Sequence, residues 1–227
     1  MEHHIHLVTS DQPRNGKTLL ARTLADCLTA DRITVTVMDC NGPQGRLAQW
    51  FSGNAYVLDL SRTDGQIALF DHILANPHSS YVIDLPALHL DRFFEIANAG
   101  GFIEETRHMG HQFTTWFIID RAQPSFRKAR AIWHETQGQL VPVRNESIGC
   151  YGDDPQVQRS YQELAQLGEL TLPALTETAI KWLEPRTNSL QHLAHPPKDQ
   201  SLKMRPPSEL FVYLNGMITQ LETIGRF

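Results

Sequence analysis

Cysteine is scarce in this chain of 227 residues. The three cysteines, Cys27, Cys40 and Cys150, are odd in number, lie far apart and form no Cys-x-x-Cys pair. This spacing excludes the disulfide framework of a small secreted domain and provides no zinc motif. We therefore expect the protein to work in a reducing compartment, the cytoplasm.

Long apolar runs are missing as well. No positively charged segment with an apolar core behind it opens the chain, and no run of about 18 apolar residues occurs. Internal repeats and low-complexity tracts are also absent. The sequence therefore predicts neither a secretory leader nor a membrane-spanning helix, and it fits one globular domain over residues 1–227.

Neither sign of charge is in large excess. The 20 Lys and Arg residues against 25 Asp and Glu residues give a net charge of −5, which is no global field for nucleic acid or anionic lipid. Four basic residues do lie on or beside one expected helix, namely Arg121, Arg127, Lys128 and Arg130. They are the candidates for DNA contact, although at this net charge the pattern is more typical of a solvated helix face.

What the chain does contain is an alternation of apolar strands with amphipathic helices. The expected strands cover residues 5–9, 32–38, 55–60, 80–86, 113–120, 140–144 and 169–172. The expected helices begin near residue 19 and then cover 64–75, 91–99, a further piece to 108, 125–137, 156–166, 174–183 and 207–224. This order predicts an α/β fold with a mostly parallel sheet covered by helices on both faces. Residues 185–207, which contain five prolines, are predicted to be a surface loop.

The first strand is joined to the first helix by a phosphate-loop motif at residues 15–18, Asn-Gly-Lys-Thr. Here backbone N–H groups and the helix N-terminus favour a phosphate, Lys17 would reach the β- and γ-phosphates, and the Thr18 hydroxyl would ligate Mg²⁺. The first glycine of the G-x-x-x-x-G-K-[ST] pattern is replaced by Asp11. The position of the motif between strand and helix nevertheless indicates phosphate binding.

Two later strands each end on an acid, Asp39 and Asp84. The carboxyl ends of parallel strands meet at one edge of the sheet, which is where ligands bind. Carboxylates at that edge can orient the water shell of Mg²⁺. Either acid alone is equally well explained as the cap of the following helix.

Three segments resemble the ParA/MinD group of P-loop ATPases, which position plasmids, chromosomes or cell-division components. They are residues 15–18, residues 37–45 (Val-Met-Asp-Cys-Asn-Gly-Pro-Gln-Gly), which resemble the family's Asp-x-Asp-Pro-Gln-Gly switch, and residues 81–86 (Tyr-Val-Ile-Asp-Leu-Pro). The resemblance implies a P-loop NTPase fold, ATP and Mg²⁺ as ligands, a nucleotide-dependent homodimer and a protein partner.

The same resemblance implies roles for individual residues. Asn145, after the strand 140–144, corresponds to the residue that contacts adenine. Lys17 and Asp39 would be catalytic, and Thr18, Asp39 and Asp84 would hold the metal. The nucleotide-binding residues would be Asp11, Gln12, Pro13, Arg14, Asn15, Gly16, Lys17, Thr18 and Asn145.

Two departures from the family pattern predict slow hydrolysis. The signature Lys that reaches the nucleotide of the partner subunit is replaced by Gln12, and Pro13 offers no N–H to a phosphate. The second switch acid is replaced by Asn41 or Gly42, and an amide cannot take up the proton of an attacking water. Nucleotide binding can survive these losses because positioning and charge supply most of phosphoryl-transfer catalysis, and Arg14 is a candidate replacement cation.

Two other interpretations remain open at this point. A dethiobiotin-synthetase-like ATP-dependent ligase has a loop of the same length, partly echoed by residues 8–11, and would need a substrate pocket at the same edge. A degenerate P-loop protein would instead act by recruiting partners. Nucleotide binding with and without Mg²⁺, followed by size measurement with ATP against ADP, separates these interpretations. ATP-dependent dimerisation favours the ParA/MinD-like ATPase, dependence on a carboxylate substrate favours the ligase, and absence of any response favours the partner-recruiting protein.

Overall fold

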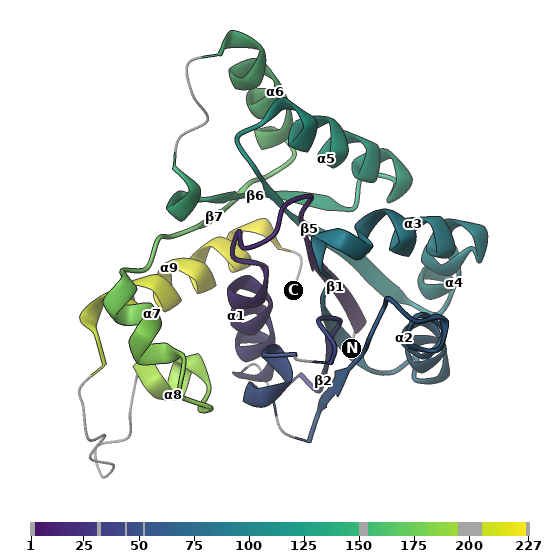
Figure 1. Cartoon of the computed structure of the whole chain (residues 1–227), viewed down its shortest axis with the longest axis horizontal. Helices are drawn as coiled ribbons and strands as arrows, with labels where there is room; N and C mark the ends of the chain where they lie inside the picture. Colours follow the sequence, from purple (N-terminus) through teal and green to yellow (C-terminus); the bar gives the residue numbers. More distant parts are fainter. Residues whose placement is uncertain are drawn as a thin grey trace.

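A computed structural model describes residues 3–30, 33–43, 45–51, 53–149, 154–194 and 206–225, so Cys150 lies outside the described residues. Its centre is a seven-stranded sheet in the order β3-β2-β4-β1-β5-β6-β7 (Figure 1). Every neighbouring pair of strands is parallel. The strands are β1 (His3–Thr9), β2 (Val35–Asp39), β3 (Ala55–Val57), β4 (Ser80–Asp84), β5 (His111–Ile119), β6 (Leu140–Asn145) and β7 (Leu170–Leu172).

Helices cover both faces of this sheet (Figure 1). One face packs against α1 (Lys17–Ala30), α7 (Glu177–Leu183), α8 (Leu190–Ala194) and α9 (Ser208–Ile224). The other face packs against α2 (Thr63–Ala75), α3 (Leu90–Ala99), α4 (Phe102–His108), α5 (Gln123–Glu135) and α6 (Pro155–Ala165). The predicted α/β fold with a two-sided parallel sheet is confirmed.

Two-sided coverage explains why the central strands are nearly continuous apolar runs. Successive side chains point to opposite faces. Val8 and Val82 therefore join the core beneath α1, whereas Leu7 and Ile83 join the core beneath α2 to α5. All five residues of β4 are buried.

The edge strand β3 is shorter than predicted. The expected strand 55–60 ends at Val57 because the chain then turns toward the loop after β2: the N–H of Gly42 donates to the carbonyl of Leu58, and Asn41 forms an antiparallel bridge with Asp59. Strand β5 begins at His111, two residues before its predicted start.

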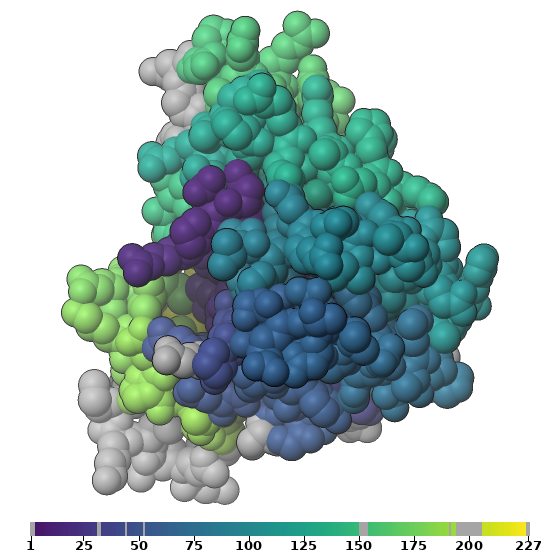
Figure 2. Space-filling model, turned by 45° about the vertical axis from the view of Figure 1, so that its right-hand side comes forward, coloured from purple at the N-terminus to yellow at the C-terminus, as the bar shows by residue number. Residues whose placement is uncertain are grey.

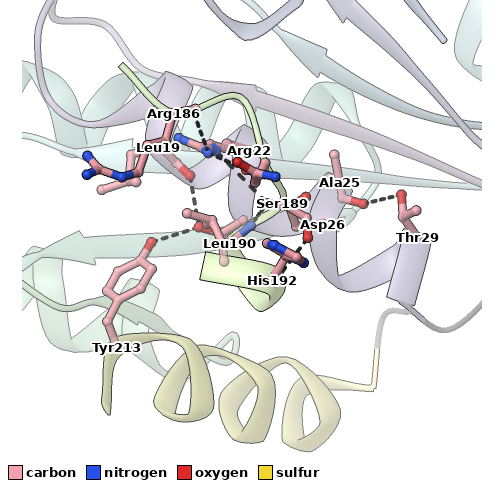
Figure 3. Close-up of polar contacts among 12 residues, drawn as sticks. Leu19, Arg22, Ala25, Asp26, Thr29, Arg186, Ser189, Leu190, His192 and Tyr213 are labelled. Carbon is pink, nitrogen blue, oxygen red and sulfur yellow. Dashed lines mark hydrogen bonds and ion pairs between the residues drawn. The ribbon is translucent and has the colours of Figure 1, made fainter. Parts of the chain in front are cut away.

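The surface loop predicted for residues 185–207 is wrong in its first half. Within it lies α8, whose Leu190 and Leu193 are fully buried. This segment is fixed to α1 by hydrogen bonds: Arg22 donates to the carbonyls of Arg186 and Asn188, and Asp26 accepts from the N–H of Leu190. Figure 3 shows Arg22 and Asp26 of α1 beside Arg186 and Leu190. The part of the predicted loop over 195–205 lies outside the described residues.

None of the helices in the described ranges is both long and apolar enough to cross a membrane.

Candidate functional site

The loop between β1 and α1 is shaped for close approach to a ligand. Gly16 has a φ of 97°, a left-handed conformation that glycine adopts without strain. A Cβ on Gly16 would lie 2.7 Å from Nδ2 of Asn145 and 3.0 Å from Cδ2 of Leu172. Glycine is therefore required at this position by both its backbone angle and its neighbours.

Lys17 is the cation of this loop, and its side chain is folded under the loop. Its Nζ donates to the carbonyl of Gln12 (2.7 Å), to Oγ of Ser10 (3.1 Å) and to Oδ1 of Asn15 (3.2 Å). Burial lowers the pKa of Lys17, and the carboxylates of Asp84 and Asp11 oppose that shift. The three acceptors hold a buried ammonium at the helix N-terminus, where phosphate oxygens can replace them.

Thr18 and Asp84 form the second part of the site. Asp84 lies in register with Val8 of β1 and with Asp39 of β2, which brings the acid beside the loop. The Thr18 hydroxyl donates to Oδ2 of Asp84 (2.6 Å), while Oδ1 of Asp84 is buried without a hydrogen-bond partner. Burial raises the pKa of Asp84 to about 6, against the lowering effect of the Thr18 hydrogen bond.

These two residues suit Mg²⁺. A hydroxyl and an unpartnered carboxylate oxygen are the hard oxygen groups that Mg²⁺ and its waters require. In the described part of the chain, no cluster of three or more His, Cys, Asp or Glu side chains is arranged to hold a metal ion without further ligands. Mg²⁺ here would therefore depend on phosphate oxygens and water in addition to Thr18 and Asp84.

Asp39 is the other acid expected to hold the metal. Both of its carboxylate oxygens accept hydrogen bonds from the loop that follows β2. Its Oδ1 accepts from the N–H of Asn41 (3.1 Å) and its Oδ2 from the N–H of Ala48 (3.0 Å). Gly45 packs so closely that a Cβ there would lie 2.5 Å from Oδ2 of Asp39. Asp39 thus fixes Asn41, Gly45 and Ala48 in the loop that follows β2.

Asn145 lies at the predicted place, at the end of β6, and its side chain makes hydrogen bonds within the protein. Its Nδ2 donates to the carbonyl of Asn15 (2.7 Å), and its Oδ1 accepts from the N–H and the hydroxyl of Ser147. Both ends of the amide are engaged within the protein. Asn145 therefore holds the phosphate loop against the end of β6.

The four loop residues before Asn15, at positions 11–14, lie around the site. Oδ1 of Asp11 accepts from the Ser125 hydroxyl (2.7 Å), which fastens the loop to α5. Gln12, Pro13 and Arg14 are exposed. Arg14, with a φ of 59°, lines both of the cavities that adjoin the loop.

These cavities lie side by side at the carboxyl edge of the sheet. A cleft of about 820 Å³ lies over residues 11–19, and a pocket of about 320 Å³ lies beside it. Figure 2 shows the loop, in purple, projecting over this hollow with the light-green α7 segment on its other side. The pocket lining includes Leu19, Arg22, Trp50, Leu172, Ile180 and Leu183.

Sequence reasoning missed this pocket. Its walls come from α1, from the 3₁₀ helix η1 (Leu47–Trp50) and from β7, α7 and the segment between them, which are far apart in sequence. The Arg22 guanidinium carbon lies 4.1 Å from the centre of the Trp50 ring. No spacing in the sequence signals that these residues meet.

Comparison with known proteins shows the fold. No protein-family model and no curated protein matches the chain. The MinC:MinD cell division protein complex of Aquifex aeolicus contains a chain with a TM-score of 0.58 at 12% identity, over 98% of this chain and 95% of that one. A ParA family ATPase from Chlorobium tepidum TLS has a TM-score of 0.56 at 14% identity, over 95% and 98%. MinD of A. aeolicus has a TM-score of 0.54 at 12% identity, over 97% of both chains. The chain therefore has the P-loop ATPase fold seen in MinD and ParA proteins.

Proposed function

We propose that this protein binds ATP at the phosphate loop and works as a nucleotide-controlled switch of the ParA/MinD kind. The observation that carries the proposal is the convergence of Lys17, Thr18 and Asp84 at one edge of a parallel sheet. A buried ammonium, a helix N-terminus and a hydroxyl paired with a carboxylate together suit a polyphosphate. The adjoining apolar pocket offers room for the base.

Each residue then has a defined task. Lys17 would bind the β- and γ-phosphates, and Thr18 with Asp84 would hold Mg²⁺, which offsets phosphate charge when bound. Asp39 fixes Asn41 and Ala48 of the neighbouring loop. Because Gln12 and Asn41 supply neither a cation nor a proton acceptor, we propose that ATP hydrolysis is slow.

The biological role that fits this site is cargo positioning or plasmid maintenance in the cytoplasm. A slow switch suits such a role because the bound nucleotide sets the time for which an assembly persists. We propose an ATP-dependent homodimer as the active state, with a further protein as its partner.

Lys17→Ala tests the nucleotide site. Loss of charged hydrogen bonds worth about 3 kcal/mol predicts a roughly hundredfold weaker ATP affinity in calorimetry. Lys181→Ala is the matched control, because the Lys181 side chain is exposed and pairs with Glu177 on its own helix. The circular dichroism of both variants should equal that of the wild type. Unchanged affinity in Lys17→Ala would refute the site, and absence of ATP binding by the wild type would favour the partner-recruiting interpretation.

A further inference from the structure

Two carboxylates lie side by side beneath the phosphate loop. Asp39 and Asp84 end neighbouring strands in the same register, and neither side chain is exposed. Two buried carboxylates at such a place repel each other unless hydrogen bonds or a cation offset their charges. The offset is visible in the structure: Thr18 and the charge of Lys17 act on Asp84, the N–H of Ala48 donates to Asp39, and the Asn41 side chain contacts both acids.

The side-chain amide of Asn41 bridges the two acids. Its Nδ2 donates to Oδ1 of Asp39 at 3.0 Å and to Oδ2 of Asp84 at 2.9 Å. An amide nitrogen carries two hydrogens, so one NH₂ group supplies a donor to each carboxylate. The amide thereby gives the two acids a shared, neutral hydrogen-bond donor.

The backbone holds this amide in place. The N–H of Asn41 donates to Asp39, and the N–H of Gly42 donates to the carbonyl of Leu58 (3.0 Å). Further along the loop, the N–H of Ala48 donates to Oδ2 of Asp39. The Asn41 side chain is therefore already in place between the acids. Withdrawing it together with its segment would break several hydrogen bonds.

The Asn41 bridge also limits which carboxylate oxygens of Asp39 and Asp84 are free to interact with a metal ion or its waters. Asp39 accepts three N–H hydrogens, and Oδ2 of Asp84 accepts from both Thr18 and Asn41. An amide NH₂ is a donor and cannot ligate a cation. Mg²⁺ waters need carboxylate oxygens as acceptors, and the one left without a partner in this pair is Oδ1 of Asp84.

We infer that Asn41 weakens the metal dependence of this site: its amide already donates to Asp39 and Asp84, so Thr18 and Asp84 hold Mg²⁺ only weakly and nucleotide binds almost as well without the metal as with it. The inference rests on the proposed nucleotide binding and adds to it a residue that acts by positioning. Removing the amide frees acceptor oxygens on both acids, and Mg²⁺ then contributes strongly to affinity.

The test is the affinity for ATP in excess Mg²⁺ and in excess EDTA. For the wild type we expect the two dissociation constants to agree within about threefold, and for Asn41→Ala we expect Mg²⁺ to tighten binding at least about tenfold. Asn98→Ala, an exposed position on α3, should behave as the wild type. Mn²⁺ binding in the presence of ADP, followed by electron paramagnetic resonance, should be weak in the wild type and stronger in Asn41→Ala.

The outcomes separate the two proposals. Tight wild-type binding in Mg²⁺ that disappears in EDTA overturns the role of Asn41 and leaves the nucleotide site standing. Absence of binding in both conditions overturns the nucleotide site, and the inference with it. If Asn41→Ala loses its native circular dichroism, Asn41→Ser serves in its place, and the wild-type comparison in EDTA decides the question without any variant.

Discussion

Asn145 shows how a single side chain connects the end of a strand to the phosphate loop. Its amide nitrogen bonds to the carbonyl of Asn15, and its position limits residue 16 to glycine. A residue in this place determines the shape of the loop. It therefore affects every ligand that the loop holds by its phosphates.

We expect Asn145→Ala to weaken ATP and GTP binding by similar factors, about tenfold each, because one buried hydrogen bond to the loop is lost while no base contact changes. Fluorescence titration with the two nucleotides measures this. Asn98→Ala is again the exposed control. A much larger loss for ATP than for GTP would show that the side chain reads adenine.

At the scale of whole elements, side chains of α1 attach the segment before α8 and the C-terminal helix α9. Arg22 is buried, contacts the Trp50 ring in the pocket wall and donates to two carbonyls of the segment before α8. Tyr213 of α9 (Figure 3) also contacts α1, and its hydroxyl lies 2.8 Å from that of Thr23. Helix α1 thus links the phosphate loop, the pocket and the C-terminal helices.

Leu193→Ala should destabilise the protein by about 2–4 kcal/mol, since the substitution leaves a cavity at a fully buried position. Urea unfolding followed by circular dichroism gives the value. Leu88→Ala removes the same atoms from a side chain that is 86% exposed and should change stability by less than about 0.5 kcal/mol. Equal small effects would mean that α8 does not belong to the core.

Asp26 gives this attachment a pH dependence. Burial raises its pKa from 3.8 to about 6, while the N–H of Leu190 and the Arg22 guanidinium oppose the rise. Between these two pKa values the folded protein holds a proton that the unfolded chain has released. Asp26 therefore contributes stability that increases as the pH falls from 7 toward 4 and is lost as the pH rises through about 6.

We expect the unfolding free energy of the wild type, relative to that of Asp26→Asn, to rise by about 1 kcal/mol between pH 7 and pH 5. The comparison isolates Asp26, because other titrating groups are common to both proteins and the asparagine oxygen can still accept from Leu190. Urea unfolding of both proteins at the two pH values measures the difference. A constant difference would mean that Asp26 ionises as it does in the unfolded chain.

On the scale of the whole molecule, apolar side chains gather around the cleft over the phosphate loop. Leu88 is 86% exposed and Ile180 is 44% exposed, and Pro13 and Ala87 line the same cleft. Exposed apolar groups beside a ligand site are typical of a surface that contacts another protein. They fit the proposed nucleotide-dependent homodimer.

We expect light scattering to give twice the monomer mass with a non-hydrolysable ATP analogue and the monomer mass with ADP. Leu88→Glu should prevent this doubling while preserving ATP affinity, because a charge at an apolar contact opposes association. Val212→Glu alters a side chain that is 68% exposed and does not line the cleft, and it should still dimerise. A monomer in every nucleotide state would contradict the proposal.

The sequence alone determined the kind of fold and the edge that carries the site. Apolar runs alternating with long helices lead to a parallel sheet, because each strand must be covered on both faces. In such a sheet the carboxyl ends converge, so the motif at residues 15–18 and the acids at the ends of β2 and β4 meet whatever the loop details.

Only the tertiary structure decided which atoms of these residues remain available. Asp39 and Asp84 look alike in sequence, yet the bonds from Asn41 and Ala48 engage Asp39, while Asp84 keeps one oxygen without a partner. Likewise, α8 forms inside a proline-flanked segment because α1, more than 160 residues earlier, supplies its hydrogen-bond partners. Local patterns fix the periodicity of an element, but hydrogen bonding and burial depend on contacts between residues that the sequence places far apart.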